Sequence, residues 1–285
     1  AWAVVLDGQV AFLGAHGMAD RTTGRLVDPV NSVFRIASVS KVFTAAAVAK
    51  MVANDQLDLD DDLCQMWPWL SARLGDSDPL SLRQLLTHSS GLEDRLLGMF
   101  CAQVDDVQPM GEYLRERLPR RTTQAGIGTR YSNHGFALAG LAVAESSGMS
   151  FDEAVRSLLF EPIGMSSSSF AQPLPASLLT RLARAYGSSG DEPFALDWRN
   201  TPPAGAMVTS AEDMGRFLQD FLSSDSRLGE SAVDLLTNRH FSGHPEIPGL
   251  TLALQEQHLA GQRALVHAGG SSGYRSLFVA IPKSR

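Results

Sequence analysis

The sequence predicts an α+β fold, in which an antiparallel sheet is flanked by helices and carries an inserted all-helical lobe. Two observations predict it: alternating apolar runs stand near both ends of the chain, and helical periodicity dominates the middle, roughly residues 55–245. With 285 residues, of which 44% are hydrophobic, the chain can bury one large core. We therefore expect a single domain over residues 1–285, with a sheet lobe of roughly residues 1–55 and 246–285 and a helical lobe of roughly residues 56–245.

The first predicted element is a β-hairpin at the start of the chain. Residues 2–6 and 9–13 are short apolar runs, and the pair Asp7-Gly8 between them favours a tight turn. Alternating runs return near the end of the chain, at residues 250–254, 263–267 and 276–281. Because strands stand at both ends, we expect one antiparallel sheet built from the two ends of the chain.

Helices are predicted between these strands. Residues 38–54 are rich in Ala, Val, Lys and Met, with Ser38 placed to start the helix, so we expect a mostly apolar, buried helix. Further helical patterns, punctuated by Gly and Pro, lie at residues 81–87, 107–118, 132–146, 151–159, 211–221 and 231–238. Small polar residues and glycine predict loops at residues 166–169 and 187–190.

Charge and hydropathy argue against two classes of partner. The formal net charge is −7 and the acidic residues are scattered, so no basic stripe is available to neutralise nucleic-acid phosphates. No apolar run approaches the roughly 20 residues that a membrane-spanning helix needs. We therefore expect no nucleic-acid partner and no membrane span in this segment, and the start of the chain shows no signal-peptide pattern.

Neither the cysteines nor the acidic residues form a metal-binding pattern. Cys64 and Cys101 are too few and too widely spaced for a zinc knuckle or a disulfide framework. The acidic cluster at residues 58–62 is similar to a calcium loop, but Leu63 stands where the turn glycine should be. We interpret this cluster as a solvated turn between helices, and we expect neither a metal nor a cofactor.

A hydroxyl and an amine stand three positions apart at the start of the first predicted helix, on Ser38 and Lys41. This spacing puts both groups on one helix face. A hydroxyl needs a base to become a nucleophile near neutral pH, and a lysine desolvated in an apolar helix loses its proton more readily. The N–H groups at a helix start can also stabilise a developing oxyanion. Taken alone, the pair is better explained by an N-cap serine and a surface lysine.

Two further stretches place polar side chains at element boundaries. Tyr131 and Asn133 follow a Gly-rich turn and precede a predicted helix; a tyrosine beside cations can shuttle a proton, and an asparagine can orient an acyl substrate. His267 ends a strand-like run and is followed by Ala-Gly-Gly, whose small side chains permit another backbone to approach the strand edge. Taken one at a time, both stretches are better explained by packing, helix capping or a surface position.

Together, the order and separation of these three stretches resemble the three signatures of the serine β-lactamase and penicillin-binding superfamily. The second and third signatures, Tyr-Ser-Asn and His-Ala-Gly, are similar to the class C branch: class C β-lactamases, D-Ala-D-Ala carboxypeptidases and family VIII carboxylesterases. The resemblance covers nearly the whole chain through residues 85–92, 161–165 and 203–214. It implies one catalytic domain with a β-lactamase/transpeptidase-like fold, and it favours a periplasmic or secreted protein.

The resemblance implies a role for each matching residue. The implied catalytic residues are Ser38, Lys41, Tyr131 and His267, and the implied substrate-binding residues are Asn133, Gly269 and Gly270. In this scheme the serine is the nucleophile, the lysine and tyrosine are the base and acid pair, and the histidine lies near the reacting group. The N–H groups of Ser38 and Gly270 would form the oxyanion hole. Which of Lys41 and Tyr131 takes the first proton stays open, because coupled groups share their titration.

Three rival sites deserve comparison with this scheme. Residues 269–273 match G-x-S-x-G and would make Ser271 a nucleophile. That motif requires a following helix and, further downstream, an Asp or Glu and a His. Residues 274–285 instead have the pattern of a strand and contain no Asp, Glu or His. His88 precedes Ser89 and Ser90 at a predicted helix end, which suggests structural hydrogen bonding. The remaining pair, His240 and His244, lacks the helical context that would make it a metal site.

Two departures from the resemblance guide the expected activity. His267 replaces the usual Lys and Ala268 replaces the usual Thr, so this strand offers neither a fixed positive charge nor a hydroxyl to a substrate carboxylate. The branch also carries a helix before the first hairpin and a strand and helix after the last strand, so either flanking segments lie outside this sequence or the chain is shortened.

We expect a serine hydrolase that acts through an acyl-enzyme on a neutral ester or amide, with carboxylesterase activity preferred. The alternative within the superfamily is a β-lactamase or D-Ala-D-Ala carboxypeptidase, so the expected partner is a small-molecule ester, amide or β-lactam. The alternative from another class is a non-catalytic relative that only binds a ligand. The presence of Ser38, Lys41, Tyr131 and Asn133 together weighs against that alternative, because a binding protein has no chemical need for them.

Overall fold

Strands from the two ends of the chain form two separate antiparallel sheets in the computed structural model. The first sheet pairs β1 (Trp2–Leu6) with β2 (Gln9–Gly14). The second has the strand order β11-β10-β9 and consists of β9 (Gln255–Leu259), β10 (Gln262–Ser271) and β11 (Tyr274–Ala280). The α+β class is confirmed, but the prediction of one sheet built from both chain ends is wrong. The structure describes residues 1–75, 79–187 and 192–282.

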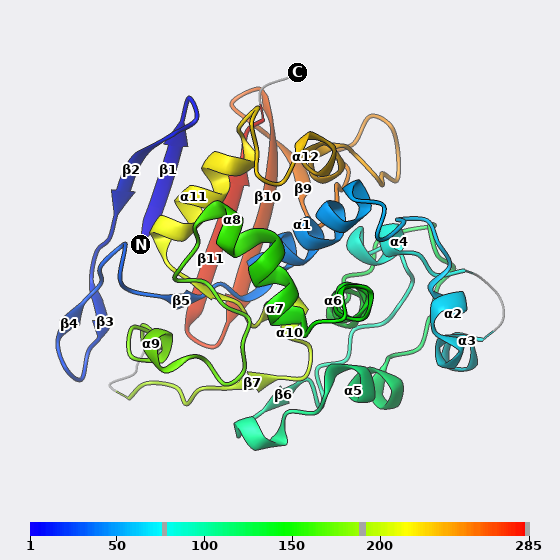
Figure 1. The fold of residues 1–285 in the computed structure, drawn as a ribbon, viewed down its shortest axis with the longest axis horizontal. Coiled ribbons are helices and arrows are strands. Elements are labelled where there is room, and N and C mark those ends of the chain that lie inside the picture. The colour runs from blue at the N-terminus through cyan, green and yellow to red at the C-terminus, as the bar shows by residue number, and fades with distance from the viewer. Residues whose placement is uncertain (76–78, 188–191, 283–285) are drawn as a thin grey trace.

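Helix α11 (Ala211–Phe221) contacts both sheets (Figure 1). A Cβ atom at Gly215 would stand 3.1 Å from the Cβ of Ala3 in β1, so the helix approaches the hairpin closely here. The rings of Phe217 and Phe221 contact Phe278 of β11, with centroids 6.1 and 6.0 Å apart. The helix therefore packs on both sheets and links them through its side chains.

The hairpin turn at the start of the chain has the predicted geometry. Asp7 and Gly8 both have positive φ, 48° and 75°, as the turn type favoured by Asp-Gly requires. Most side chains of β1 and β2 are exposed or half-buried, which agrees with a two-stranded element that contacts the rest of the protein mainly through α11.

The last three strands differ from the sequence prediction in one place. Residues 250–254, predicted as a strand, form a loop with isolated bridges at Leu250, and β9 begins only at Gln255. Ala253 has φ 70°, which interrupts an extended chain, and Leu252 and Leu254 are buried. The apolar residues alternate there because a loop, and not a strand, packs Leu252 and Leu254 into the core. β10 and β11 include the other two predicted runs, and β10 continues through Ser271.

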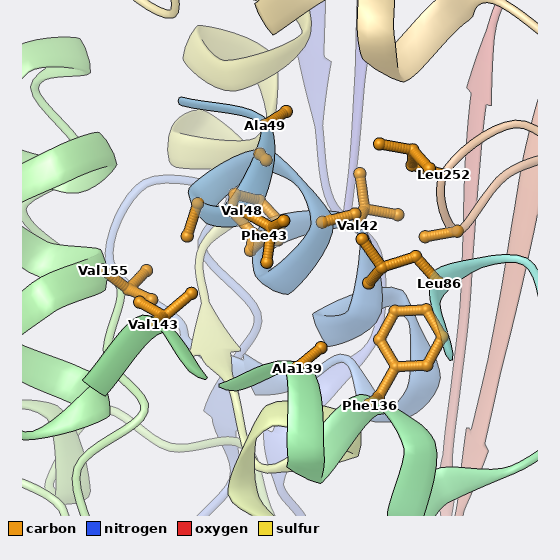
Figure 2. Close-up of a cluster of buried hydrophobic side chains, with 14 of the residues drawn as sticks. Val42, Phe43, Val48, Ala49, Leu86, Phe136, Ala139, Val143, Val155 and Leu252 are labelled. Carbon is orange, nitrogen blue, oxygen red and sulfur yellow. The ribbon is translucent and has the colours of Figure 1, made fainter. Parts of the chain in front are cut away.

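Helix α1 (Ser40–Ala53) passes through the core of the protein. All its side chains from Ser40 to Ala49 are buried, and small alanines allow the neighbouring helices α6 and α12 to approach it. Figure 2 shows Val42, Phe43 and Val48 of α1 among side chains from other elements, including Phe136 of α6. The prediction of a buried apolar helix is confirmed, although the α-helix begins at Ser40 and residues Ala37–Val39 form a 3-10 turn before it.

Some of the remaining helices follow the predicted patterns with shifted ends, whereas others were not predicted. The remaining helices are α2 (Leu63–Met66), α3 (Pro68–Leu74), α4 (Leu82–Leu86), α5 (Met110–Arg117), α6 (Asn133–Ser147), α7 (Phe151–Val155), α8 (Glu161–Ile163), α9 (Ala176–Leu179), α10 (Pro202–Gly205) and α12 (Glu230–Thr237). The short helices α2, α3, α9 and α10 are those that were not predicted. A π-helical segment, Arg156–Phe160, joins α7 to α8, so the predicted helix at 151–159 runs further. Pro109 delays α5 relative to the predicted start at 107, because α5 begins only after it.

Short paired strands link distant stretches around the chemistry-bearing residues. β5 (Phe34–Arg35) pairs with β8 (Val208–Thr209), β6 (Phe100–Cys101) with β7 (Trp198–Arg199), and β3 (Met18–Asp20) with β4 (Arg25–Leu26). Of the two predicted loops, residues 166–169 are confirmed apart from a bridge at Ser169, and residues 188–190 lie outside the described part of the chain. Within the described ranges, no helix has the length and apolar character to cross a membrane.

Candidate active site

Ser38 lies in the 3-10 turn before α1, where its side chain is free to serve as a reacting group. The sequence predicted that Ser38 starts the helix, but α1 begins two positions later, at Ser40, with Val39 as its N-cap. Its Oγ accepts hydrogen bonds from Tyr131 Oη at 2.8 Å and from Lys41 Nζ at 3.3 Å. Ala37 just before it has φ 47°, a strained conformation of the kind that concentrates at functional sites.

Lys41 is fully buried, and its amine makes three hydrogen bonds but no ion pair among the described residues. Besides Ser38, Nζ donates to Asn133 Oδ1 at 2.8 Å and to the Ala204 carbonyl oxygen at 2.6 Å. Burial, and then the positive charge of Arg199, lower the pKa of Lys41 well below its ordinary value, against an opposite effect of Asp94. A lysine in this environment gives up its proton readily, so it can act as a base towards Ser38.

Tyr131 contributes a protonated phenol to the same network. Burial raises the pKa of Tyr131 to about 12, although its hydrogen bond to Ser38 acts in the opposite direction. Its ring lies 4.8 Å from Lys41 Nζ and packs against the ring of His88. Near neutral pH the tyrosine therefore donates to Ser38 Oγ and holds a proton ready for transfer.

Asn133 is held by a carboxylate that sequence reasoning did not single out. Asp94 accepts from the Asn133 N–H at 3.0 Å and from its Nδ2 at 2.7 Å, which turns the amide so that Oδ1 faces Lys41. His134 Nδ1 lies 3.6 Å from Asp94. Burial alone would raise the pKa of Asp94, but His134 and the N–H donors of Asn133 lower it below its ordinary value. Ser132, not Asn133, caps α6 through the Gly135 N–H.

His267, Gly269 and Gly270 lie within β10 and approach the serine through the backbone. A Cβ atom at Gly269 would overlap the Ile36 carbonyl oxygen and would stand 3.2 Å from the Ser38 nitrogen, so only glycine lets β10 lie this close. Pairing between β9 and β10 stops at Val266, which lies opposite Gln255, the first residue of β9. From His267 onward, this edge of β10 pairs with no strand of the described chain. That edge is free to bind a substrate backbone.

His267 is buried and carries no charge near neutral pH. Burial and the neighbouring charge of Lys41 lower the pKa of His267 to about 4. Its Nδ1 lies 2.9 Å from the Ala268 carbonyl oxygen. The strand itself therefore provides neither a cation nor a hydroxyl beside the serine, as the sequence predicted.

The rival sites have structural partners instead of the features that catalysis requires. Ser271 lies in β10 and leads into β11 without a helix. His88 accepts from the Ser132 N–H at 3.1 Å, and burial lowers its pKa well below the ordinary value. His240 contacts Arg83 and the Leu235 carbonyl. Within the described residues no group of His, Cys, Asp and Glu is arranged to hold a metal ion.

Two further residues near the site were missed by the sequence interpretation. Asp94 follows Gly91, close to residues that the resemblance already covered, so its position beside a matched stretch was a usable signal. Arg199 belongs to β7 and is 6% exposed, and its Nη2 donates to Ser271 Oγ at 2.8 Å. No spacing in the sequence connects it to the site, because only the fold brings β7 beside β10.

The chain is similar to proteins of one known family. The Beta-lactamase family profile matches residues 1–285. Esterase EstB of Burkholderia gladioli is 32% identical over 206 residues, covering 68% of this chain and 51% of the esterase. Penicillin-binding protein 4 of Amycolatopsis lactamdurans is 30% identical over 269 residues, covering 85% of this chain and 65% of that protein. The chain thus spans about half to two thirds of the length of these curated relatives.

Solved structures share the fold at lower sequence identity. The octameric penicillin-binding protein homologue from Pyrococcus abyssi superposes with a TM-score of 0.79 at 22% identity, covering 98% of this chain and 66% of that one. A class C β-lactamase superposes with a TM-score of 0.78 at 20% identity, covering 98% of this chain and 83% of that one. The predicted β-lactamase/transpeptidase-like fold is confirmed.

Proposed function

Because the chain belongs to the β-lactamase family, we propose that it is a serine hydrolase that cleaves an ester or amide through an acyl-enzyme on Ser38. One observation carries the proposal: a single serine oxygen accepts hydrogen bonds from a buried lysine and from a tyrosine 93 positions away in the sequence. A nucleophile in contact with both a base and a proton donor is what acyl transfer requires. A purely binding relative has no use for this arrangement.

Acylation starts with proton transfer from Ser38 to neutral Lys41. The Oγ atom attacks the substrate carbonyl carbon while its proton passes to Nζ, 3.3 Å away. The high pKa of Tyr131 argues against the tyrosine as first base, so we assign that role to Lys41. The carbonyl oxygen becomes an oxyanion, and we propose that the N–H groups of Ser38 and Gly270 stabilise it.

The leaving group then departs with a proton. Tyr131 donates its hydroxyl proton to the leaving oxygen or nitrogen and recovers the proton held by Lys41. Water attacks the acyl-enzyme by the same route in reverse: its proton goes to the lysine and tyrosine pair, the acyl–Oγ bond breaks, and Ser38 Oγ is reprotonated. Asn133 keeps Lys41 in place through Oδ1 and has its own position fixed by Asp94.

We propose an ester as the preferred substrate. The uncharged His267 and the methyl side chain of Ala268 leave β10 without the cation and hydroxyl that favour peptide C-termini and β-lactams. The 32% identity to an esterase supports this preference. β-Lactam or D-amino-acid peptide hydrolysis is the second candidate, supported by the similarity to a penicillin-binding protein and to class C β-lactamase structures.

Labelling followed by mass spectrometry tests the proposal. The protein is treated with a fluorophosphonate or a labelled penicillin, and we expect one adduct, on the peptide that contains Ser38. Unmodified protein would identify a binding relative, and an adduct on Ser271 would move the nucleophile to the rival motif. Comparison of a short-chain 4-nitrophenyl ester with a chromogenic cephalosporin then ranks the two substrate classes; faster cephalosporin cleavage would reverse the ester preference.

A further inference from the structure

Arg199 is a buried cation near the catalytic network that forms no direct ion pair with a carboxylate within the described chain. Arg199 is 6% exposed, and the nearby Asp197, whose charge also acts on Arg199, makes its ion pair with Arg35 at 2.8 Å. Nη2 donates to Ser271, the guanidinium lies 4.7 Å from the centre of the Phe100 ring, and Nε is buried without a hydrogen-bond partner. A buried guanidinium with unused donors has capacity for an anionic ligand.

The backbone around Arg199 is built to hold the guanidinium in this place. Gln172 accepts from the Arg199 N–H at 2.8 Å and donates to its carbonyl oxygen at 2.8 Å, which fixes the main chain. A Cβ atom at Gly205 would stand 2.8 Å from Nη1, so the glycine provides the space that the guanidinium fills. The residue before it, Ala204, accepts a hydrogen bond from Lys41, which places Arg199 next to the catalytic network.

The direction of β10 indicates which part of a substrate reaches Arg199. His267 stands at one end of this strand segment, and Gly270, the proposed oxyanion donor, follows it by three positions. The strand leads away from His267 through Gly270 to Ser271, where Arg199 is bound. We take the acyl part, whose carbonyl oxygen would lie at Gly270, to extend along the strand towards Ser271 and Arg199.

We propose that Arg199, held by Ser271 and Phe100, binds a carboxylate on the acyl part of the substrate. The inference rests on the proposed acyl-enzyme function and narrows its substrate class to half-esters of dicarboxylic acids and chemically similar anionic acyl compounds. It replaces the sequence-based expectation of a neutral substrate, which considered only the residues that follow His267. Arg199 comes from β7, a part of the chain that the sequence did not connect to the site.

A planar guanidinium fits this ligand well. It offers parallel N–H donors that match the two oxygens of a carboxylate, and it stays protonated at all working pH values. The low solvent exposure of Arg199 strengthens its interaction with an anion and reduces screening by salt. Replacement by lysine would keep the charge but would lose the two-point geometry.

The test compares two esters with equal acyl chain length, mono-(4-nitrophenyl) adipate and 4-nitrophenyl hexanoate. The variants are Arg199→Met and Arg199→Lys, with Arg275→Met as the matched control, because Arg275 is exposed and its Nη1 binds only main-chain carbonyls of Ser271 and Tyr274. We expect R199M to lower the ratio of kcat/KM for the adipate to that for the hexanoate by about tenfold to a hundredfold. R199K should give a smaller loss, and R275M should leave the ratio within about twofold because an exposed charge is screened.

A binding measurement separates this inference from the proposed function. Calorimetry with Ser38→Ala measures binding of monomethyl adipate and methyl hexanoate in the absence of turnover. Tighter binding of the adipate that is lost in S38A/R199M supports the subsite even if ester hydrolysis is absent. The Arg199 subsite would be overturned by an unchanged kcat/KM ratio in R199M. It would also be overturned if both compounds bound equally to S38A and to S38A/R199M while thermal stability was retained. Loss of Ser38 labelling would overturn only the proposed function.

Discussion

The two sides of the candidate site are built on different physical principles. The helical side consists of Ser38, Lys41, Tyr131 and Asn133, whose side chains form one hydrogen-bond network in which burial shifts the pKa of the lysine and the tyrosine in opposite directions. The strand side, β10 from His267 to Ser271, contributes backbone proximity through glycine and no charge of its own. We therefore propose that the helical side moves protons, while the strand side sets distances and, through Arg199, recognises the substrate.

The strongest test of this contrast removes the base from the helical side. Lys41→Met keeps a buried side chain of similar length but has no group to accept the serine proton, so kcat/KM should fall by about three to four orders of magnitude. Lys50→Met is the control, since this second lysine of α1 binds the Arg227 carbonyl away from the network. Stopped-flow hydrolysis of a 4-nitrophenyl ester measures both variants; a K41M enzyme with more than a tenth of the original activity would refute the role of Lys41.

The next largest effect should come from the strand side. Gly269→Ala adds a Cβ atom that overlaps the Ile36 carbonyl oxygen and Ser276 Oγ, so β10 has to move away from the serine. We expect the rate of Ser38 labelling to fall about a hundredfold, because a misplaced oxyanion donor costs that much in related chemistry. Gly243→Ala, where the nearest atom would lie 3.8 Å away, is the matched control. Equal labelling of both variants would show that β10 does not set the geometry.

A smaller effect should follow from loss of the carboxylate that supports Asn133. Lys41 must be neutral to act, so activity should fall as pH drops through the lowered pKa of Lys41. The negative charge of Asp94 acts to raise the pKa of Lys41, so Asp94→Asn should move the acid limb of the kcat/KM profile to lower pH, with a loss of about tenfold at the plateau. Glu93→Gln, which removes an exposed neighbouring charge, should leave the limb in place. A shift of the D94N limb to higher pH would contradict this assignment.

The smallest predicted effect concerns the histidine of the strand side. His267 has a pKa of about 4, so near neutral pH it is uncharged and adds no charge beside Lys41. His267→Gln should therefore leave the midpoint of the acid limb unchanged, whatever it does to the plateau. Displacement of that midpoint by a full unit would mean that the histidine titrates with the lysine, and the two sides of the site would then share the proton chemistry.

The sequence predicted the helical side more completely than the strand side. Ser38 and Lys41 are three positions apart on one helix, and Tyr131 begins the stretch before another helix, so local patterns and the resemblance pointed to them together. Asp94 was missed because a lone carboxylate in a loop has no periodic signal. Arg199 was missed because its partner Ser271 is 72 positions away and the pairing depends on how β7 meets β10.

The same division applies to the fold. Periodicity and turn residues predicted the hairpin at Asp7-Gly8, the buried helix α1 and the α+β class, since each depends on short-range sequence. The division into two sheets and the loop at residues 250–254 depend on contacts between distant segments, which no local pattern contains.

By itself, the sequence determined which groups could react: a hydroxyl, an amine and a phenol at recognisable positions. Only the tertiary structure decided their protonation and their surroundings. Burial removes water from Lys41 and raises the pKa of the partly exposed Tyr131, and the fold brings a neutral histidine near Lys41 and a charged arginine to Ser271. Desolvation and proximity are properties of folded neighbours, and for that reason the chemistry of each side chain follows from the fold around it.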